Sequence, residues 1–281
     1  FSPVCSHTEA VRLTEWRRAP ASRGPQTGTL HDAEEEPHVR NKWYWAFKNV
    51  FFGPALRLWN RPWSEGMDRI PKTGSAILAS NHQAVMDSFY FPLLCPRQIT
   101  FLAKSEYFTT PGFVGGIQKW FFTSVGQTPI DRTAKSASDG MMVSARRVLD
   151  AGDLWGIYPE GTRSPDGRVY RGRTGMARVA MDTGEQVIPI AMINSRKANP
   201  IGTWIPRPVK VGVRVGDPID PRAWAAERGL DPHDHATARE FTDYVMRTLA
   251  DLAGKPYVDV YASDVKKSLA AGEGYPPGAE L

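Results

Sequence analysis

The sequence predicts an α/β sandwich in which one mostly buried central sheet is flanked by helices. Two observations support this prediction. From residue 70 onward, short, largely apolar runs alternate with stretches of helical periodicity. Strands of this kind are typical of a sheet that is covered by helices on its faces. A chain of 281 residues is long enough to bury such a core.

Five apolar runs are expected to form the strands of this sheet. They are residues 75–80, 98–103, 154–158, 187–193 and 209–216. Between them, Met141, Ala145 and Leu149 lie on one face of an amphipathic helix. Thr237 and Glu240 have the spacing of a capping box, which predicts that a later helix begins there.

The two ends of the chain differ from this central part in composition. Residues 1–40 are polar, contain four prolines and include an acidic run, so they are expected to form a flexible arm. Residues 270–281 are rich in proline and glycine and are expected to form a loose tail.

An aromatic segment, residues 41–64, lies between the arm and the first strand. Trp43, Phe47 and Phe51 recur at helical spacing, and Gly53-Pro54 is predicted to break or kink the helix. Aromatic side chains and cations on a helix too short to span a bilayer are typical of helices that lie in a membrane interface. The alternative is a helix packed against the core.

Composition restricts the classes of partner. The chain has 35 basic and 30 acidic residues, a net charge of +5, which is compatible with nucleic acid, an anionic lipid surface or a phosphorylated small molecule. It has no basic stripe or nucleic-acid-binding motif, so we do not expect nucleic acid.

No apolar run is long enough to predict a membrane-spanning helix. Two cysteines cannot form a disulfide framework, which favours an intracellular protein.

The first candidate site follows the apolar run 75–80. His82 and Asp87 are five positions apart, about 140° from each other on an ideal helix. They can meet only if His82 lies on a strand-to-helix turn and Asp87 lies in the first helical turn. The pair would then suit a general base, with the carboxylate holding the imidazole. The alternative is an ordinary surface or core histidine.

The second candidate site follows the apolar run 154–158. The Arg163 guanidinium has a shape suited to phosphate, and Thr162 adds a hydroxyl group. Glu160, which precedes Gly161, could pin the arginine or help to hold the loop. The alternative is an ordinary turn with a surface ion pair.

Two more cations, Lys104 and Arg132, fall in similar places along the sequence. Each alone is expected to be a solvated charge, but together with Arg163 they would place a base beside a phosphate pocket. His233 and His235 suggest a metal only weakly, because a zinc site needs three or four ligands, so an exposed loop and no metal are expected.

Several blocks occur in a characteristic order along the chain. They are Asn81-His82-x₄-Asp87, Lys104-Ser105-Glu106, Ile130-Asp131-Arg132, Glu160-Gly161-Thr162-Arg163-Ser164 and Val187-Ile188-Pro189-Ile190. Over roughly residues 65–220 the chain resembles the glycerolipid acyltransferase superfamily, in particular the 1-acylglycerol-3-phosphate (lysophosphatidic acid) acyltransferases. One departure is Gly172-Arg173-Thr174-Gly175, which lacks the usual leading aromatic residue; Tyr170 is a candidate substitute.

This resemblance implies acyl transfer from acyl-CoA or acyl-carrier protein to the hydroxyl of lysophosphatidic acid, without a cofactor. It implies that His82 is the general base and that Asp87 orients it. The implied substrate-phosphate site comprises Arg163, Glu160, Gly161, Thr162, Lys104 and Arg132. Backbone amides at and beside Gly161 are candidate oxyanion donors.

The resemblance also implies an acyltransferase domain over residues 65–269 and peripheral or monotopic attachment to the cytoplasmic face of the cell membrane. Trp43, Phe47 and Phe51 are the expected membrane contacts. Two alternatives remain open: another acceptor, either glycerol 3-phosphate or a glycolipid sugar, and a catalytically silent lipid-binding membrane module.

Overall fold

The computed structural model describes residues 42–103, 127–129, 137–203 and 205–281. These ranges lie in one unit, Arg40–Leu281. The arm predicted for residues 1–40 lies outside the described residues, as do Lys104 and Arg132.

In the described ranges, the main sheet has seven strands in the order β1-β8-β7-β2-β5-β3-β4. Their bounds are Trp63–Glu65 (β1), Ala76–Ser80 (β2), Ile99–Ala103 (β3), Gln127–Pro129 (β4), Leu154–Ile157 (β5), Val187–Ile193 (β7) and Gly212–Val215 (β8). Neighbouring strands are parallel except β7 and β8, which are antiparallel. The five predicted strands are confirmed, with β8 shorter than expected.

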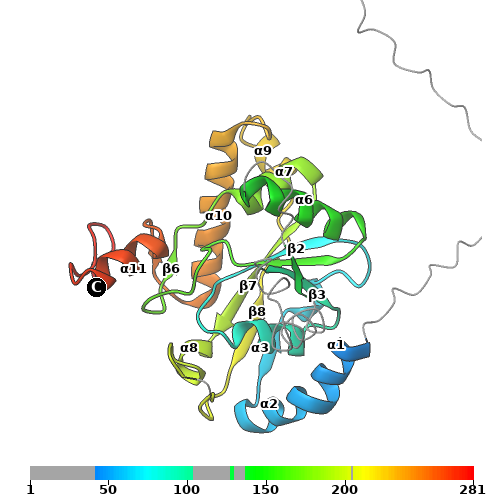
Figure 1. Cartoon of the computed structure of the whole chain (residues 1–281). Helices are drawn as coiled ribbons and strands as arrows, with labels where there is room; N and C mark the ends of the chain where they lie inside the picture. Colours follow the sequence, from blue (N-terminus) through cyan, green and yellow to red (C-terminus); the bar gives the residue numbers. More distant parts are fainter. Residues whose placement is uncertain (1–41, 104–126, 130–136, 204) are drawn as a thin grey trace, which may run out of the picture. The chain divides into compact units, whose positions relative to one another are not determined.

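Helices cover both faces of this sheet, which confirms the predicted α/β sandwich (Figure 1). On one face are α6 (Ala137–Asp150), α7 (Gly175–Thr183), α9 (Pro221–Ala226) and α10 (His235–Ala253), and on the other are α2 (Phe52–Asn60) and α3 (Asp87–Leu94). The side chains of β2 alternate between the two cores: Leu78 packs with α3, and Ile77 packs with α6, α7 and α10.

The remaining elements are short. They are α1 (Lys42–Ala46), a π-helical segment (Phe47–Phe51), a 3₁₀ turn (Met67–Arg69), α8 (Ser195–Ala198), α11 (Ala262–Ala270) and a two-stranded parallel sheet of β6 (Val169–Tyr170) and β9 (Tyr257–Val258). None of the helices in the described ranges combines the length and apolar composition needed to cross a bilayer.

The N-terminal helical element runs without a break through Gly53-Pro54, where a break or a kink was predicted. Pro54 lies inside α2, and the irregularity precedes it as the π-helical segment. Proline lacks an N–H and its ring crowds the carbonyl four residues earlier, and a wider π turn relieves that crowding. Gly53 is required here because any β-carbon at this position would collide with the carbonyl of Lys48.

The capping box predicted at Thr237 and Glu240 is wrong. The helix α10 begins at His235, and its N-cap is Asp234, three positions before Thr237; the Asp234 carboxylate accepts the Ala236 N–H at 3.1 Å. Thr237 is buried within the first turn. The side chain of an aspartate with extended backbone angles directly before a helix can accept the free N–H groups of the first turn. Asp234 does so here, so the helix starts before Thr237.

The loose tail predicted for residues 270–281 is also wrong. Ala279 is fully buried in a small core with Tyr170 and Val265. The Arg168 guanidinium donates to the carbonyls of Ala279 and Glu280 at 2.6 and 2.7 Å. Arg168 and Tyr170 lie more than a hundred residues earlier in the sequence, so the composition of the tail did not reveal these contacts.

Candidate active site

The two candidate loops lie side by side because they follow neighbouring parallel strands. β2 pairs with β5 in parallel register, from Ala76 opposite Leu154 to Ala79 opposite Ile157. The carboxyl ends of both strands therefore meet at the same edge of the sheet, where α/β proteins place their ligands. One loop leads from β2 into α3, and the other leaves β5 at Tyr158.

His82 and Asp87 form the predicted pair. His82 lies on the turn before α3 and Asp87 is the first residue of that helix, with 3.0 Å between Nδ1 and Oδ2. The fully buried carboxylate also accepts the N–H groups of Gln83 and Ala84 at 2.6 and 2.8 Å. Because a carboxylate only accepts hydrogen bonds, Nδ1 carries the proton and Nε2 presents its lone pair.

Tyr158 fixes the plane of the imidazole. Its ring stacks on His82 with centroids 4.0 Å apart and an interplanar angle of 13°, and Phe101 lies parallel to its ring at 5.4 Å. The Tyr158 hydroxyl shares a 3.1 Å hydrogen bond with Ser88. Burial raises the pKa of Tyr158, so the phenol remains neutral. Sequence reasoning did not identify this role, although an aromatic residue directly after β5 was visible.

Glu160 holds the two loops together. One carboxyl oxygen accepts the His82 N–H at 3.1 Å and the other accepts the Tyr170 N–H at 3.2 Å. The Ser164 N–H donates to the His82 carbonyl at 2.7 Å, so the second loop binds both backbone groups of the histidine. Glu160 is 2% exposed, and burial raises its pKa to about 8. The structure therefore favours the loop-holding alternative over a phosphate contact.

Gly161 has a structural role instead of the predicted one. Its φ of 70° lies in the left-handed region, and its N–H donates to the Tyr158 carbonyl at 2.9 Å, closing the turn. That N–H is therefore occupied and does not act as an oxyanion or phosphate donor in this conformation.

Asn81 connects the site to the neighbouring strand β7. Its side-chain oxygen accepts the Met192 N–H at 2.7 Å, and the residue is fully buried. The amide continues the pairing of β2 with β7 beyond Ser80 and fixes the start of the histidine loop. Sequence reasoning quoted Asn81 as part of a block but gave it no role.

Three cations gather at the second loop. Arg163 lies in the loop and is partly exposed. Lys266 of α11 donates to the Thr162 hydroxyl at 2.8 Å, and Arg196 of α8 donates to the carbonyls of Ser164 and Pro165 at 2.9 and 2.5 Å. Sequence reasoning identified Arg163 and Thr162 but neither Lys266 nor Arg196, which lie outside the recognised blocks.

Two further residue groups named from the sequence, the His233–His235 pair and Tyr170, lie as follows. In the described ranges, no group of three or more histidine, cysteine or acidic residues could hold a metal ion, and His233 and His235 are exposed. Tyr170 is buried in the small core and donates to Asp166 at 2.7 Å, so its side chain is directed into that core.

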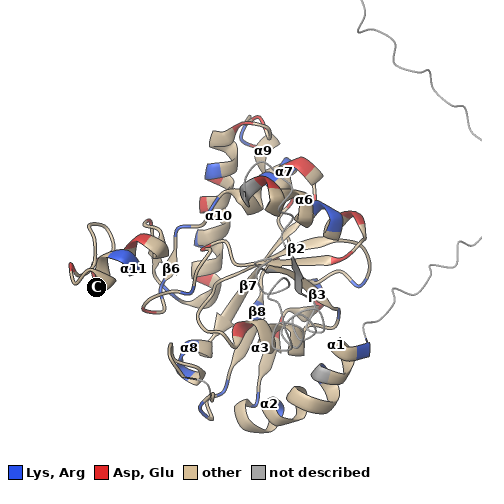
Figure 2. Ribbon diagram, viewed as in Figure 1, with Lys and Arg blue, Asp and Glu red and all other residues tan. Residues whose placement is uncertain are grey.

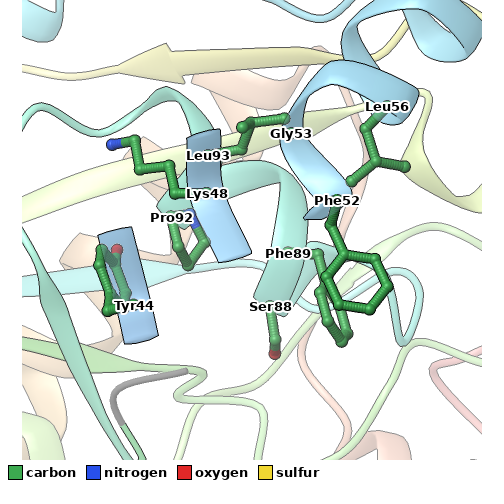
Figure 3. Close-up of a pocket in the computed structure, with 9 residues that line it drawn as sticks. All are labelled: Tyr44, Lys48, Phe52, Gly53, Leu56, Ser88, Phe89, Pro92 and Leu93. Atoms are coloured by element: carbon green, nitrogen blue, oxygen red, sulfur yellow. The ribbon is translucent and has the colours of Figure 1, made fainter. Parts of the chain in front are cut away.

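An apolar pocket lies between the N-terminal helical element and α3. Phe52 and Leu56 line it from one side, and Phe89 and Leu93 line it from the other (Figure 3). Ser88 also lines this pocket and bonds to Tyr158, which stacks on His82. Ser88 therefore connects the lining of this pocket to the aromatic ring that stacks on His82.

The N-terminal element also exposes large apolar side chains. Trp43, Trp45, Val50, Phe51, Phe52, Leu58 and Trp59 are each at least 43% exposed. The side chain of Phe47 lies outside the described residues. In Figure 2 the α1–α2 element shows few acidic residues, whereas charges of both signs cover α6, α7 and α10. Large exposed apolar patches mark sites of interaction with membranes or proteins.

A family model described as Acyltransferase matches residues 62–193. The chloroplastic 1-acyl-sn-glycerol-3-phosphate acyltransferase LPAT1 of Arabidopsis thaliana is 30% identical over 140 residues, which cover 50% of this chain and 38% of that protein. The 1-acyl-sn-glycerol-3-phosphate acyltransferase of Limnanthes alba is 28% identical over 194 residues, covering 68% and 66%. The present chain therefore spans between 38% and 66% of these two relatives.

A solved structure of an acyltransferase has a similar fold. The crystal structure of the 1-acyl-sn-glycerophosphate (LPA) acyltransferase PlsC from Thermotoga maritima matches with a TM-score of 0.57 and 25% identity, covering 76% of this chain and 80% of that one. The fold and these matches define a domain of the O-acyltransferase type. Over the matched region the chain resembles the lysophosphatidic acid acyltransferases of the glycerolipid acyltransferase superfamily.

Proposed function

We propose that this protein transfers a fatty acyl group from acyl-CoA or acyl-carrier protein to the hydroxyl of lysophosphatidic acid, forming phosphatidic acid. The observation that carries the proposal is the His82–Asp87 pair, held at 3.0 Å at the carboxyl end of β2 beside a loop that carries cations. Residues 65–269 are the proposed catalytic domain, and residues 41–64 are the proposed interfacial element.

In the proposed reaction, His82 Nε2 removes the proton from the acceptor hydroxyl as its oxygen attacks the thioester carbonyl carbon. Asp87 stabilises the imidazolium that forms. Collapse of the tetrahedral intermediate forms the ester, breaks the C–S bond and returns the proton to the departing thiolate. A positioned general base contributes about 10²–10⁴-fold to such a rate.

The experiment that tests this function measures free thiol release from acyl-CoA in the presence of lysophosphatidic acid. We expect release that depends on both substrates, with phosphatidic acid as the lipid product. Parallel reactions with glycerol 3-phosphate and a glycolipid sugar test the other acceptors, and acyl-carrier protein tests the other donor. Absence of transfer to every acceptor would support a silent lipid-binding module instead.

Replacing Arg163 by alanine should raise the KM for lysophosphatidic acid by about 10- to 100-fold, because a charged hydrogen bond to phosphate is lost. The KM for acyl-CoA should change little. Arg178→Ala, on α7 and also partly exposed, is the matched control. Steady-state kinetics with each substrate varied in turn measure both constants; equal increases for donor and acceptor would contradict a phosphate role.

The N-terminal element is proposed to bind the membrane surface peripherally, at the cytoplasmic face of the cell membrane. The double substitution Phe51→Ser and Leu58→Ser should lower partitioning onto anionic vesicles by at least about 10-fold, because these side chains are 56% and 84% exposed and would enter the lipid. Val143→Ser with Leu269→Ser removes two exposed apolar side chains elsewhere and should have no effect. Vesicle sedimentation measures both; unchanged binding of the first variant would exclude the interfacial role.

A further inference from the structure

The loop that follows β5 is held by cations from three separate parts of the chain. Arg163 belongs to the loop, Arg196 reaches it from α8, and Lys266 reaches it from α11. Among the described residues, the Lys266 ammonium donates one hydrogen bond, to Thr162, and an ammonium group carries three donors. Lys266 lies far beyond residue 193, where the match to the Acyltransferase family ends.

These three cations lack acidic partners in the described part of the chain. No ion pair joins Arg163, Arg196 or Lys266 to a described carboxylate. Burial lowers the pKa of Lys266, and the positive charges of Arg163 and Arg196 lower it further, while Glu160 opposes them. The charges are therefore close enough to repel one another.

Glu160 compensates this positive charge only in part. Both of its carboxyl oxygens already accept backbone N–H groups, and with a pKa of about 8 it is mostly protonated at neutral pH. A cluster of like charges without a counterion is costly in the free protein, and binding of an anion relieves that cost. A phosphate monoester has a charge of about −1.5 to −2 and three acceptor oxygens.

The cation cluster adjoins the proposed base through backbone hydrogen bonds. Ser164 donates to the His82 carbonyl at 2.7 Å, and Glu160 accepts the His82 N–H at 3.1 Å. Thr162, the partner of Lys266, lies between those two residues in the sequence. An anion bound at this loop would therefore hold the rest of its molecule beside His82.

We propose that Lys266 is a substrate-binding residue that completes the acceptor-phosphate site together with Arg163. This proposal rests on the proposed function, since the phosphate belongs to lysophosphatidic acid. It assigns a binding role to α11, which lies outside the region matched by the family.

Lys266→Met should raise the KM for lysophosphatidic acid by about 10- to 100-fold, with the KM for acyl-CoA and the thermal unfolding midpoint nearly unchanged. Lys267→Met, on the same helix and exposed, is the matched control and should leave both KM values unchanged. Lys266→Arg keeps the charge and should recover most of the affinity. An acceptor KM within twofold of wild type for Lys266→Met would overturn the proposal.

A purely structural tether between Lys266 and Thr162 would give a different pattern. In that case Thr162→Val and Lys266→Met would both lower the unfolding midpoint and would affect the KM values of the two substrates equally, which would overturn the proposal.

Calorimetric titration with inorganic phosphate tests this anion site separately from the proposed acyl transfer. Weaker phosphate binding by Lys266→Met than by Lys267→Met supports the anion site even if lysophosphatidic acid is not acylated, and equal binding contradicts it.

Discussion

Replacing His82 by glutamine is expected to lower kcat for acyl transfer by about 10²–10⁴-fold, because the attacking hydroxyl loses its proton acceptor. Glutamine cannot take the proton at neutral pH, although its amide fills part of the space beside Tyr158. The backbone of residue 82 should keep its hydrogen bonds to Glu160 and Ser164, since neither involves the imidazole. Thiol release under saturating substrates measures the loss.

The control for this prediction is His233→Gln, which changes an exposed histidine just before α10 and should leave kcat unchanged. Circular dichroism and the unfolding midpoint of His82→Gln should match those of the wild type. A well-folded His82→Gln protein with kcat within threefold of wild type would remove His82 from the proposed mechanism.

The sheet and the His82–Asp87 geometry could be predicted because their signals are local. An apolar run such as residues 187–193 becomes a strand buried along nearly its whole length, and this burial is what excludes polar residues from it. The spacing of His82 and Asp87 allows contact only across a strand-to-helix turn. The structure has that turn, with Asp87 as the first residue of α3.

The cation cluster and the role of Glu160 could not be predicted because they depend on tertiary contacts. Lys266 meets Thr162 across 104 positions of sequence, and Glu160 meets His82 across 78. A carboxylate and an arginine three positions apart suggest a local ion pair, yet Glu160 is directed inward to backbone amides. Short-range sequence patterns do not indicate which distant segments provide the backbone N–H groups that Glu160 accepts, here those of His82 and Tyr170.

Replacing Glu160 by alanine is expected to reduce both stability and kcat, since one carboxyl group holds two loops. The N–H groups of His82 and Tyr170 would lose their acceptor, at a cost of about 1–3 kcal/mol of unfolding free energy for each that remains buried. A shift of His82 by about 1 Å would lower kcat by about 10²-fold. Glu240→Ala, at an exposed position of α10, is the matched control for urea unfolding and kinetics and should change neither.

The pH dependence of stability tests whether burial controls the Glu160 carboxyl. Burial raises its pKa from 4.5 to about 8, so between these values the folded state binds a proton that the unfolded state has released. The contribution of this group to the unfolding free energy is therefore fully present below about pH 4.5 and is lost as the pH rises through about 8. Glu160→Gln does not titrate, so the difference in unfolding free energy between wild type and this variant should fall across that window. A difference that rises with pH would mean that the two backbone hydrogen bonds outweigh burial and keep Glu160 ionised.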